Sequence, residues 1–255
     1  EEYCKKYSNL EHIRHRINIG GNANICRAFE YAAACGKEYV WVLCDDDKYD
    51  FNNWEEVEKR IYAKDDIICV ADYVFPEGQK DNKAYQIFQL TFVPAGIYRT
   101  GIITDDVIIN MYESIYTMFQ QACLSIDTIN RGGKITVLSK PIVFNGIDFE
   151  DRVEDVSYTR GQSKNGLISK RKQDSFWILG FASIITMLND KFLQGECMEA
   201  AIPYKDMYGN FDNFYRAINY YYVKEGKYSY FYEIYNVLHP HRQKEFDKIN
   251  ELVLN

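Results

Sequence analysis

The clearest hydrophobic pattern in the chain is the run Tyr39–Cys44, which is apolar at successive positions. Such a run predicts a central strand, because a strand covered by helices on both faces buries side chains of both orientations. A helix is expected just before it, from Ala23 to Cys35, with Asn22 as its N-cap and Gly36 as its stop. A short strand over His12–Ile17 is expected before that helix.

Helices and strands continue to alternate beyond this run. Asn53 is placed to begin a helix whose first turn carries Glu55 and Glu56, where the helix dipole favours acids. The remaining elements of the first half follow from their periodicity and glycine stops: strands over Ile67–Val74, Gln86–Val93, Lys134–Leu138 and Ile142–Phe144, and a helix over Ser114–Arg131 that ends at Gly132–Gly133. This alternation is typical of an α/β fold.

The second half of the chain has a different character. Residues Asn145–Lys172 are polar, charged and glycine-containing, which predicts an exposed loop, and the remainder is mostly helical and aromatic. The expected organisation is a core over residues 1–145, a flexible loop over 146–172 and a helical extension over 173–255. The longest apolar run, Phe176–Leu188, is too short to span a bilayer, and we expect it to pack on the domain. Lys170–Lys172 beside it leaves peripheral contact with an anionic membrane surface open.

Composition narrows the possible partners. The 255 residues carry a formal net charge of −7, whereas nucleic-acid binding requires a basic footprint, so nucleic acid is not an expected partner. The seven cysteines form no Cys-x-x-Cys pair, which argues against a zinc ribbon and a thioredoxin motif. We expect them, Cys44 included, to be reduced, buried small residues of a cytoplasmic protein.

Three adjacent acids, Asp45, Asp46 and Asp47, follow directly on the predicted central strand. In open α/β sheets, ligands bind just beyond the carboxyl ends of strands. Adjacent carboxylates repel one another, so a compensating cation is expected, and hard oxygen ligands favour Mn²⁺ or Mg²⁺. An ion with few protein ligands keeps positions open for phosphate oxygens and neutralises charge on a departing diphosphate. The alternative is a solvated acidic turn.

A glycine-containing turn, Asn18–Arg27, precedes the first long helix. Gly20 and Gly21 allow a ligand to approach the backbone closely, and a helix N-terminus attracts anions. Arg27 lies one turn into the helix and is expected to face the same cleft. The spacing is not G-x-G-x-x-G and no G-K-[ST] follows, which disfavours Rossmann dehydrogenases and P-loop NTPases. A plain turn with an Asn cap is the alternative.

Taken together, the segments NIGGNANICRAFEYA and EYVWVLCDDD resemble glycosyltransferase family 2. Its members have the GT-A fold, with an N-x-G-G-x-x-x-x-x-R-like segment before a hydrophobic strand that ends in a DxD motif. The resemblance covers the chain up to Asn145 and implies a GT-A-like (Rossmann-like) mixed sheet flanked by helices. It also implies inverting transfer of a sugar from a nucleotide-diphosphate donor, most often a UDP-sugar, to a saccharide or lipid-linked acceptor in bacterial surface polysaccharide synthesis.

The resemblance further implies roles for single residues. Asp47 and Asp45 would hold Mn²⁺ or Mg²⁺. The donor would contact residues of the glycine turn, the acidic triplet and the later polar loop: Gly20, Gly21, Asn24, Arg27, Asp45, Asp46 and Arg160. Arg160 would belong to a flexible lid and bind diphosphate oxygens through its guanidinium fork.

Two features depart from the family. Its members open with a strand and a helix that bind the nucleotide base, and neither precedes the first residue here, which would leave an unpaired sheet edge. The family's Glu-Asp pair, whose Asp is the general base, is replaced by Gln120 and Gln121, and an amide does not accept a proton at neutral pH. Asp105, Asp106 and Glu113 are the nearby candidates for the base, with Asp106 preferred over Asp105.

Two other classes of function stay open. A sugar nucleotidyltransferase also uses carboxylates and Mg²⁺, although the glycine-rich basic phosphate loop that it needs is not visible in the sequence. A catalytically impaired nucleotide- or glycan-binding module is favoured by the two glutamines and by the missing first strand. In each case we expect a cytoplasmic protein, with peripheral contact at the inner face of the membrane left open.

Overall fold

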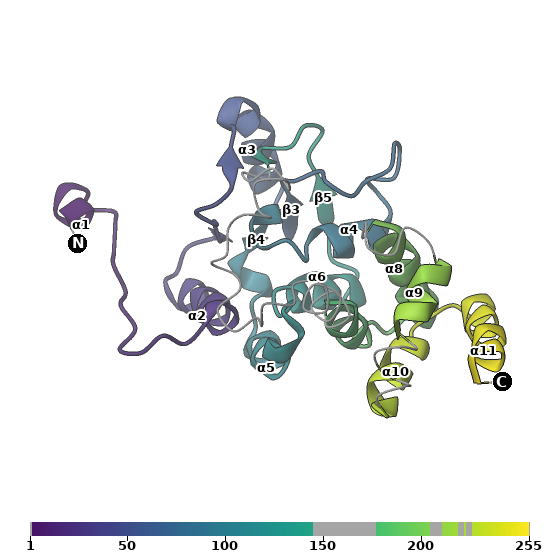
Figure 1. Ribbon diagram of the computed structural model, residues 1–255. Coiled ribbons are helices and arrows are strands. Elements are labelled where there is room, and N and C mark those ends of the chain that lie inside the picture. Colours follow the sequence, from purple (N-terminus) through teal and green to yellow (C-terminus); the bar gives the residue numbers. More distant parts are fainter. Residues whose placement is uncertain (1, 145–176, 205–210, 219–221, 223–225, 255) are drawn as a thin grey trace.

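The computed structural model describes residues 2–144, 177–204, 211–218, 222 and 226–254. They form a four-stranded mixed sheet flanked by helices, together with a separate two-stranded ribbon (Figure 1), which confirms the predicted α/β class. The sheet contains, in spatial order, β1 (Tyr39–Trp41), β4 (Gly96–Arg99), β3 (Ile67–Cys69) and β5 (Ile135–Val137). The ribbon pairs β2 (Lys48–Tyr49) with β6 (Val143–Phe144).

Strand directions give the sheet two chemically different edges. β4 runs antiparallel to both of its neighbours, and β3 runs parallel to β5. Strands β1, β3 and β5 therefore point the same way. We call the edge where they end, after Trp41, Cys69 and Val137, the carboxyl edge, and the edge where they begin the amino edge.

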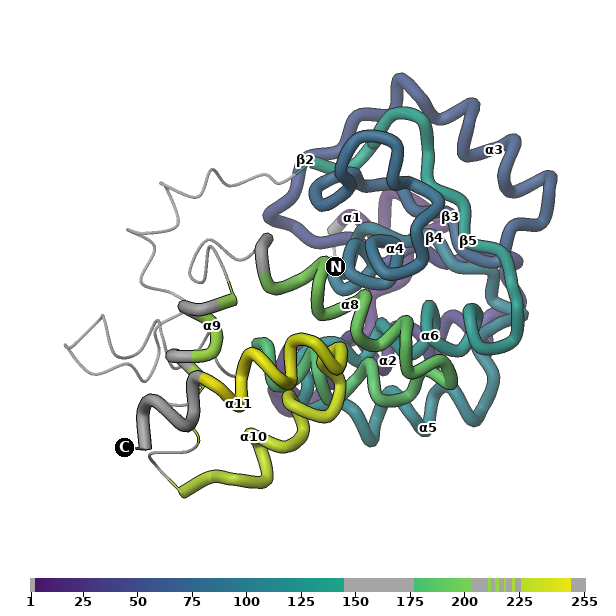
Figure 2. Tube along the Cα trace, turned by 90° about the vertical axis from the view of Figure 1, so that its right-hand side faces the viewer, coloured from purple at the N-terminus to yellow at the C-terminus, as the bar shows by residue number. Residues whose placement is uncertain are grey.

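Helices cover both faces of the sheet. Within the described residues they are α1 (Glu2–Lys6), α2 (Gly21–Ala34), α3 (Trp54–Tyr62), α4 (Lys83–Gln89), α5 (Asp105–Glu113), α6 (Ala122–Asn130), a helix over 177–185, α8 (Lys191–Tyr204), α9 (Phe211–Ile218), α10 (Tyr228–Tyr235) and α11 (Pro240–Leu254). Figures 1 and 2 agree that α2, α5 and α6 lie on one side of the sheet and α3 on the other. Figure 1 shows α1 at the end of an extended arm. In this part of the chain, every helix is too short or too polar to cross a lipid bilayer.

The helix over 177–185 joins the C-terminal helices to the core. Trp177 stacks on Phe181, and both rings contact Phe88 of α4 and Phe119 edge-on. Gly180 lies so close that a Cβ there would sit 2.1 Å from the Thr117 carbonyl oxygen, so only glycine permits this approach. The prediction that this apolar run packs on the domain is confirmed for the residues described.

Two glycine stops are confirmed. Gly36 follows α2 with φ +68°, and Gly132 follows α6 with φ +72°, a left-handed conformation that glycine adopts at little cost. The predicted helix over Ser114–Arg131 is interrupted, however. Met118 has φ +69° and separates a short 3₁₀ turn, Ile115–Thr117, from α6. A left-handed residue ends the α-helical hydrogen-bond pattern at that point.

The predicted N-caps are partly wrong. The helix α2 begins earlier, with Gly20 at the N-cap position, because the Asn22 side chain donates instead to the Ile115 carbonyl at 2.9 Å. Asn53 does precede α3, but its side chain donates to Glu56 at 3.0 Å and makes no capping bond. Neither asparagine side chain accepts a hydrogen bond from a backbone amide of the first helical turn. Asn22 instead contacts a segment far along the chain, and Asn53 contacts the side chain of Glu56.

Two of the predicted strands, Gln86–Val93 and His12–Ile17, are absent from the structure. Gln86–Val93 was expected to be a strand, but Lys83–Gln89 is helical, because Asn82 caps it by accepting from Ala84 N at 2.9 Å. Four successive residues of this helix are buried, a pattern that is equally consistent with a covered strand. His12–Ile17 forms no strand, and Ile13 and Ile17 are exposed.

The run Tyr39–Cys44 is not a central strand. Only Tyr39–Trp41 pairs, and it pairs with β4 alone, so β1 is an outermost strand of the described sheet. Its three side chains are half-buried. The chain leaves the sheet at Val42 and turns into the acidic triplet. The apolar residues of this run are shared between the sheet and that turn.

Candidate functional site

The acidic triplet lies at the carboxyl edge, as expected. The helix α2 ends at Ala34, a short connection from β1, so its N-terminus returns to the edge where β1 ends. The glycine turn and the triplet therefore meet at the same edge of the sheet. This is the position at which open α/β sheets bind ligands.

Three potential metal ligands converge there. The Cys44 sulfur and one carboxylate oxygen each of Asp46 and Asp47 all lie within 4.8 Å of one another. Asp47 and Cys44 are half-buried, whereas Asp46 is exposed. The predicted metal pair was Asp47 and Asp45, but Asp45 is outside this group. Of the predicted pair, this group contains Asp47, together with Cys44 and Asp46, and the binding of a metal stays a prediction.

The charge at this cluster acts on the thiol. Burial, reinforced by Asp47, Asp46 and Asp45, raises the pKa of Cys44 to about 11. The thiol is therefore protonated at neutral pH, and a bound cation would be needed to stabilise the thiolate. Because sulfur is a soft donor, its presence shifts metal preference toward softer transition ions such as Zn²⁺ and away from Mg²⁺, while the two carboxylates also suit Mn²⁺.

Tyr49 closes the turn that carries the cluster. Its hydroxyl donates to the Cys44 carbonyl at 2.8 Å and accepts from the Cys44 amide at 2.9 Å. Burial raises the pKa of Tyr49, so the hydroxyl keeps its proton at neutral pH. The sequence reasoning missed both Cys44 and Tyr49, since their roles depend on how the turn folds back. The one signal available was a cysteine directly before the triplet.

The glycine turn keeps its backbone open. Gly20 has φ +80°, and its amide donates to the Asn18 side chain at 2.9 Å. Within the described residues, no atom outside the turn lies within 4 Å of the position that a Cβ would take at Gly20 or Gly21. A ligand could therefore reach the N-terminus of α2 without displacing a side chain, and that terminus favours an anion.

A cleft of about 890 Å³ runs along β1 beside this edge. One wall is α2, with Asn24, Arg27 and Tyr31. Residues of the N-terminal arm, among them Ile13 and His15, and Val40 and Trp41 of β1 also line it. Its volume falls within the range of about 300–1,000 Å³ that is usual for ligand pockets. Arg27 lines the cleft as expected, although its guanidinium now pairs with Glu30 at 3.0 Å.

The proposed general bases lie elsewhere. Asp105 and Asp106 occupy the first turn of α5, where Thr104 caps the helix and both acids are exposed. Since α5 follows the end of β4, which pairs with the start of β1, these acids lie at the amino edge. Glu113, at the other end of α5, is exposed as well. The structure does not bring Asp105 or Asp106 together with the triplet.

Gln120 and Gln121 are fully buried at the start of α6. Gln121 donates to the Thr91 carbonyl, and Gln120 donates to the Asn22 carbonyl at 3.3 Å. The side-chain oxygen of each has no hydrogen-bond partner. A buried acceptor without a donor is costly. Arg160 and Lys170–Lys172 lie outside the described residues.

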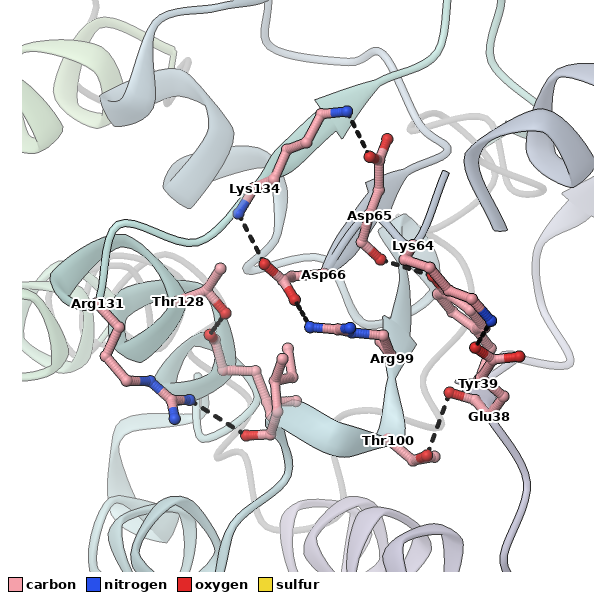
Figure 3. Close-up of polar contacts among 12 residues, drawn as sticks. Glu38, Tyr39, Lys64, Asp65, Asp66, Arg99, Thr100, Thr128, Arg131 and Lys134 are labelled. Carbon is pink, nitrogen blue, oxygen red and sulfur yellow. Dashed lines mark hydrogen bonds and ion pairs between the residues drawn. The ribbon is translucent and has the colours of Figure 1, made fainter. Parts of the chain in front are cut away.

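The amino edge carries a different set of charges (Figure 3). The Lys134 ammonium contacts the fully buried Asp65 carboxylate at 2.5 Å, an ion pair without the geometry of a directed hydrogen bond. Arg99 pairs with Asp66, and Lys64 with Glu38. Each of these acids contacts a base, so this group serves the fold rather than a ligand.

The chain was also compared with known proteins. No protein-family model matches it, and no curated protein is significantly similar to it.

Proposed function

We propose that the chain is a metal-dependent glycosyltransferase with a GT-A-like core, which uses a nucleotide-diphosphate sugar as donor. The observation that carries this proposal is the convergence of Cys44, Asp46 and Asp47 at the carboxyl edge, the edge to which the N-terminus of α2 also returns. This arrangement would place a bound divalent cation and a helix N-terminus at the same edge of the sheet, and both stabilise a diphosphate.

The donor would occupy the edge and the adjoining cleft. Its diphosphate would bridge the cation and the open backbone at Gly20 and Gly21, and its nucleoside would enter the cleft beside Trp41. Arg27 lines that cleft and supplies a positive charge once it exchanges Glu30 for phosphate. The cation would neutralise the charge that develops on the leaving diphosphate as the acceptor hydroxyl attacks from the opposite face.

The acceptor side rests on Gln120 and Gln121. Both side chains are fully buried, and an amide does not remove a proton. The same observation favours a second candidate, a module that binds the nucleotide sugar without turning it over. Calorimetry that shows binding of a UDP-sugar with no release of UDP would support this second candidate.

The test is a thermal-shift panel of UDP-, GDP-, CMP- and dTDP-sugars with and without Mn²⁺, followed by an assay of nucleotide release. A donor at about 100 times its Kd should raise the melting temperature by roughly 5–10 °C, and only with the metal present. Asp47→Asn and Asp46→Asn should abolish both the shift and Mn²⁺-dependent release, whereas Asp45→Asn should retain Mn²⁺ binding. Full activity of Asp47→Asn would contradict the proposal.

A further inference from the structure

The cluster of Cys44, Asp46 and Asp47 sits in a turn that a single side chain outside the cluster holds closed. The Tyr49 hydroxyl spans the turn and binds both main-chain polar groups of Cys44, the carbonyl at 2.8 Å and the amide at 2.9 Å. One hydroxyl thereby fixes the peptide units on either side of the first ligand. These two hydrogen bonds close the segment from Cys44 to Tyr49 into a short loop.

Tyr49 itself is held rigidly. It lies in β2, where it pairs with the fully buried Val143 of β6, and the next residue, Asp50, donates its amide to the Ile142 carbonyl at 2.9 Å. Its ring packs edge-on against Trp41 at 5.6 Å between centroids. Tyr49 is therefore anchored to the ribbon by its backbone and to the end of β1 by its ring.

From this geometry we infer that Tyr49 is the positioning residue of the metal turn: its hydroxyl holds Cys44, Asp46 and Asp47 in the arrangement that binds a divalent cation. The inference rests on the metal site of the proposed function and assigns to the site a residue that contacts no metal. Mutation of a residue that orients metal ligands without contacting the metal typically lowers the affinity for the metal about 10–100-fold.

The physical reason is the ordering of the turn. Without the hydroxyl, Cys44 has neither of these two main-chain bonds. Part of the free energy of cation binding must then be used to order the three ligands, which weakens the binding. The ring contact with Trp41 does not depend on the hydroxyl, so Tyr49→Phe removes the positioning bonds and leaves the packing in place.

The chain offers a matched control. Tyr39 also donates its hydroxyl to a main-chain carbonyl, that of Asp65, at 2.8 Å, but it does so at the amino edge. Tyr39→Phe therefore removes the same kind of bond from the same sheet, away from the metal turn. Both variants should lose a similar, small amount of thermal stability, about 1 kcal/mol.

The experiment titrates the full chain and both variants with Mn²⁺ by calorimetry and with Co²⁺ by absorption, where a thiolate-to-cobalt band reports the Cys44 bond. Tyr49→Phe should weaken Mn²⁺ binding by at least tenfold and reduce the cobalt band, while Tyr39→Phe binds like the unmodified chain. Hydrogen exchange without metal should show a faster Cys44 amide only in Tyr49→Phe.

The outcomes separate the two claims. If the unmodified chain binds neither ion, the proposed function and this inference both fall. If it binds them and Tyr49→Phe binds equally well, only the role of Tyr49 is refuted. Equal losses in Tyr49→Phe and Tyr39→Phe would also refute it, because a general loss of stability would then explain the result.

Discussion

The two edges of the sheet use acidic side chains in opposite ways. At the amino edge, Asp65, Asp66 and Glu38 each lie against a lysine or arginine that comes from another segment of the chain (Figure 3). At the carboxyl edge, Asp46 and Asp47 lie against each other and a thiol. Acids that are matched one by one with bases stabilise a fold, whereas the convergence of two acids and a thiol is the arrangement on which the proposed cation site rests.

The difference also explains the placement of the ligands along the chain. The amino-edge pairs join residues far apart in sequence, such as Asp66 and Arg99, so they tie strands together. The carboxyl-edge cluster consists of three residues, Cys44, Asp46 and Asp47, that come from a single turn of the chain. The proposed cation site is therefore formed within one turn.

The largest expected effect is on stability at the amino edge. Lys134→Met leaves the Asp65 carboxylate, which is fully buried, without the cation that contacts it at 2.5 Å. Breaking a buried pair from one side typically costs about 3–5 kcal/mol, and because Lys134 is half exposed we expect about 3 kcal/mol. Urea unfolding followed by circular dichroism measures this loss.

The double variant Asp65→Asn with Lys134→Met serves as its control. It removes the uncompensated charge and should recover most of the lost free energy of unfolding. Affinity for Mn²⁺ should be the same in all three proteins. A Lys134→Met protein as stable as the unmodified chain would show that the amino-edge charges do not hold the fold.

A smaller loss is expected from Arg99→Met. Asp66 would lose its guanidinium partner but keep the bond that it accepts from the Lys134 amide at 2.9 Å, and its side chain remains partly solvated. A hydrogen bond to a charged group contributes about 1.5–3 kcal/mol, so a loss near 1.5 kcal/mol is expected in the same urea measurement. A loss as large as that of Lys134→Met would mean that Asp66, not Asp65, is the central acid of this edge.

The sequence predicted the α/β class and the ends of two helices better than the type and extent of single elements. The alternation of helices and strands and the helix ends at Gly36 and Gly132 could be predicted because they depend on local backbone preferences. The helix α4 was taken for a strand because continuous burial removes the periodicity that separates the two. The interruption at Met118 had no local signal, since a left-handed methionine is set by tertiary packing.

The site divides in the same way. The acidic triplet and its position after a strand follow from the order of residues alone. Which members converge does not, because the direction of each side chain depends on the turn that Tyr49 closes. Asp105 and Asp106 were plausible bases by distance along the chain, but the antiparallel direction of β4 carries them to the opposite edge.

The smallest expected effect has the opposite sign at the two edges. Asp45 is exposed and adds negative charge beside the cluster, as its effect on the Cys44 pKa shows. In the absence of metal, Asp45→Asn should therefore raise the free energy of unfolding, by about 0.3–0.5 kcal/mol at low salt. Asp105 is equally exposed, but it lies in the first turn of α5, where the helix dipole favours an acid. Asp105→Asn should lower the free energy of unfolding by about 0.3–1 kcal/mol.

Both changes remove one negative charge from an exposed aspartate, so a general effect of net charge would move the two variants in the same direction. Opposite signs would instead show that local surroundings decide the sign of each change. Repeating the urea titrations in about 1 M salt, where the screening length falls to roughly 3 Å, should shrink both differences together. If Asp45→Asn destabilises the metal-free protein as much as Asp105→Asn does, the carboxyl edge is not a place of accumulated negative charge, and its contrast with the amino edge disappears.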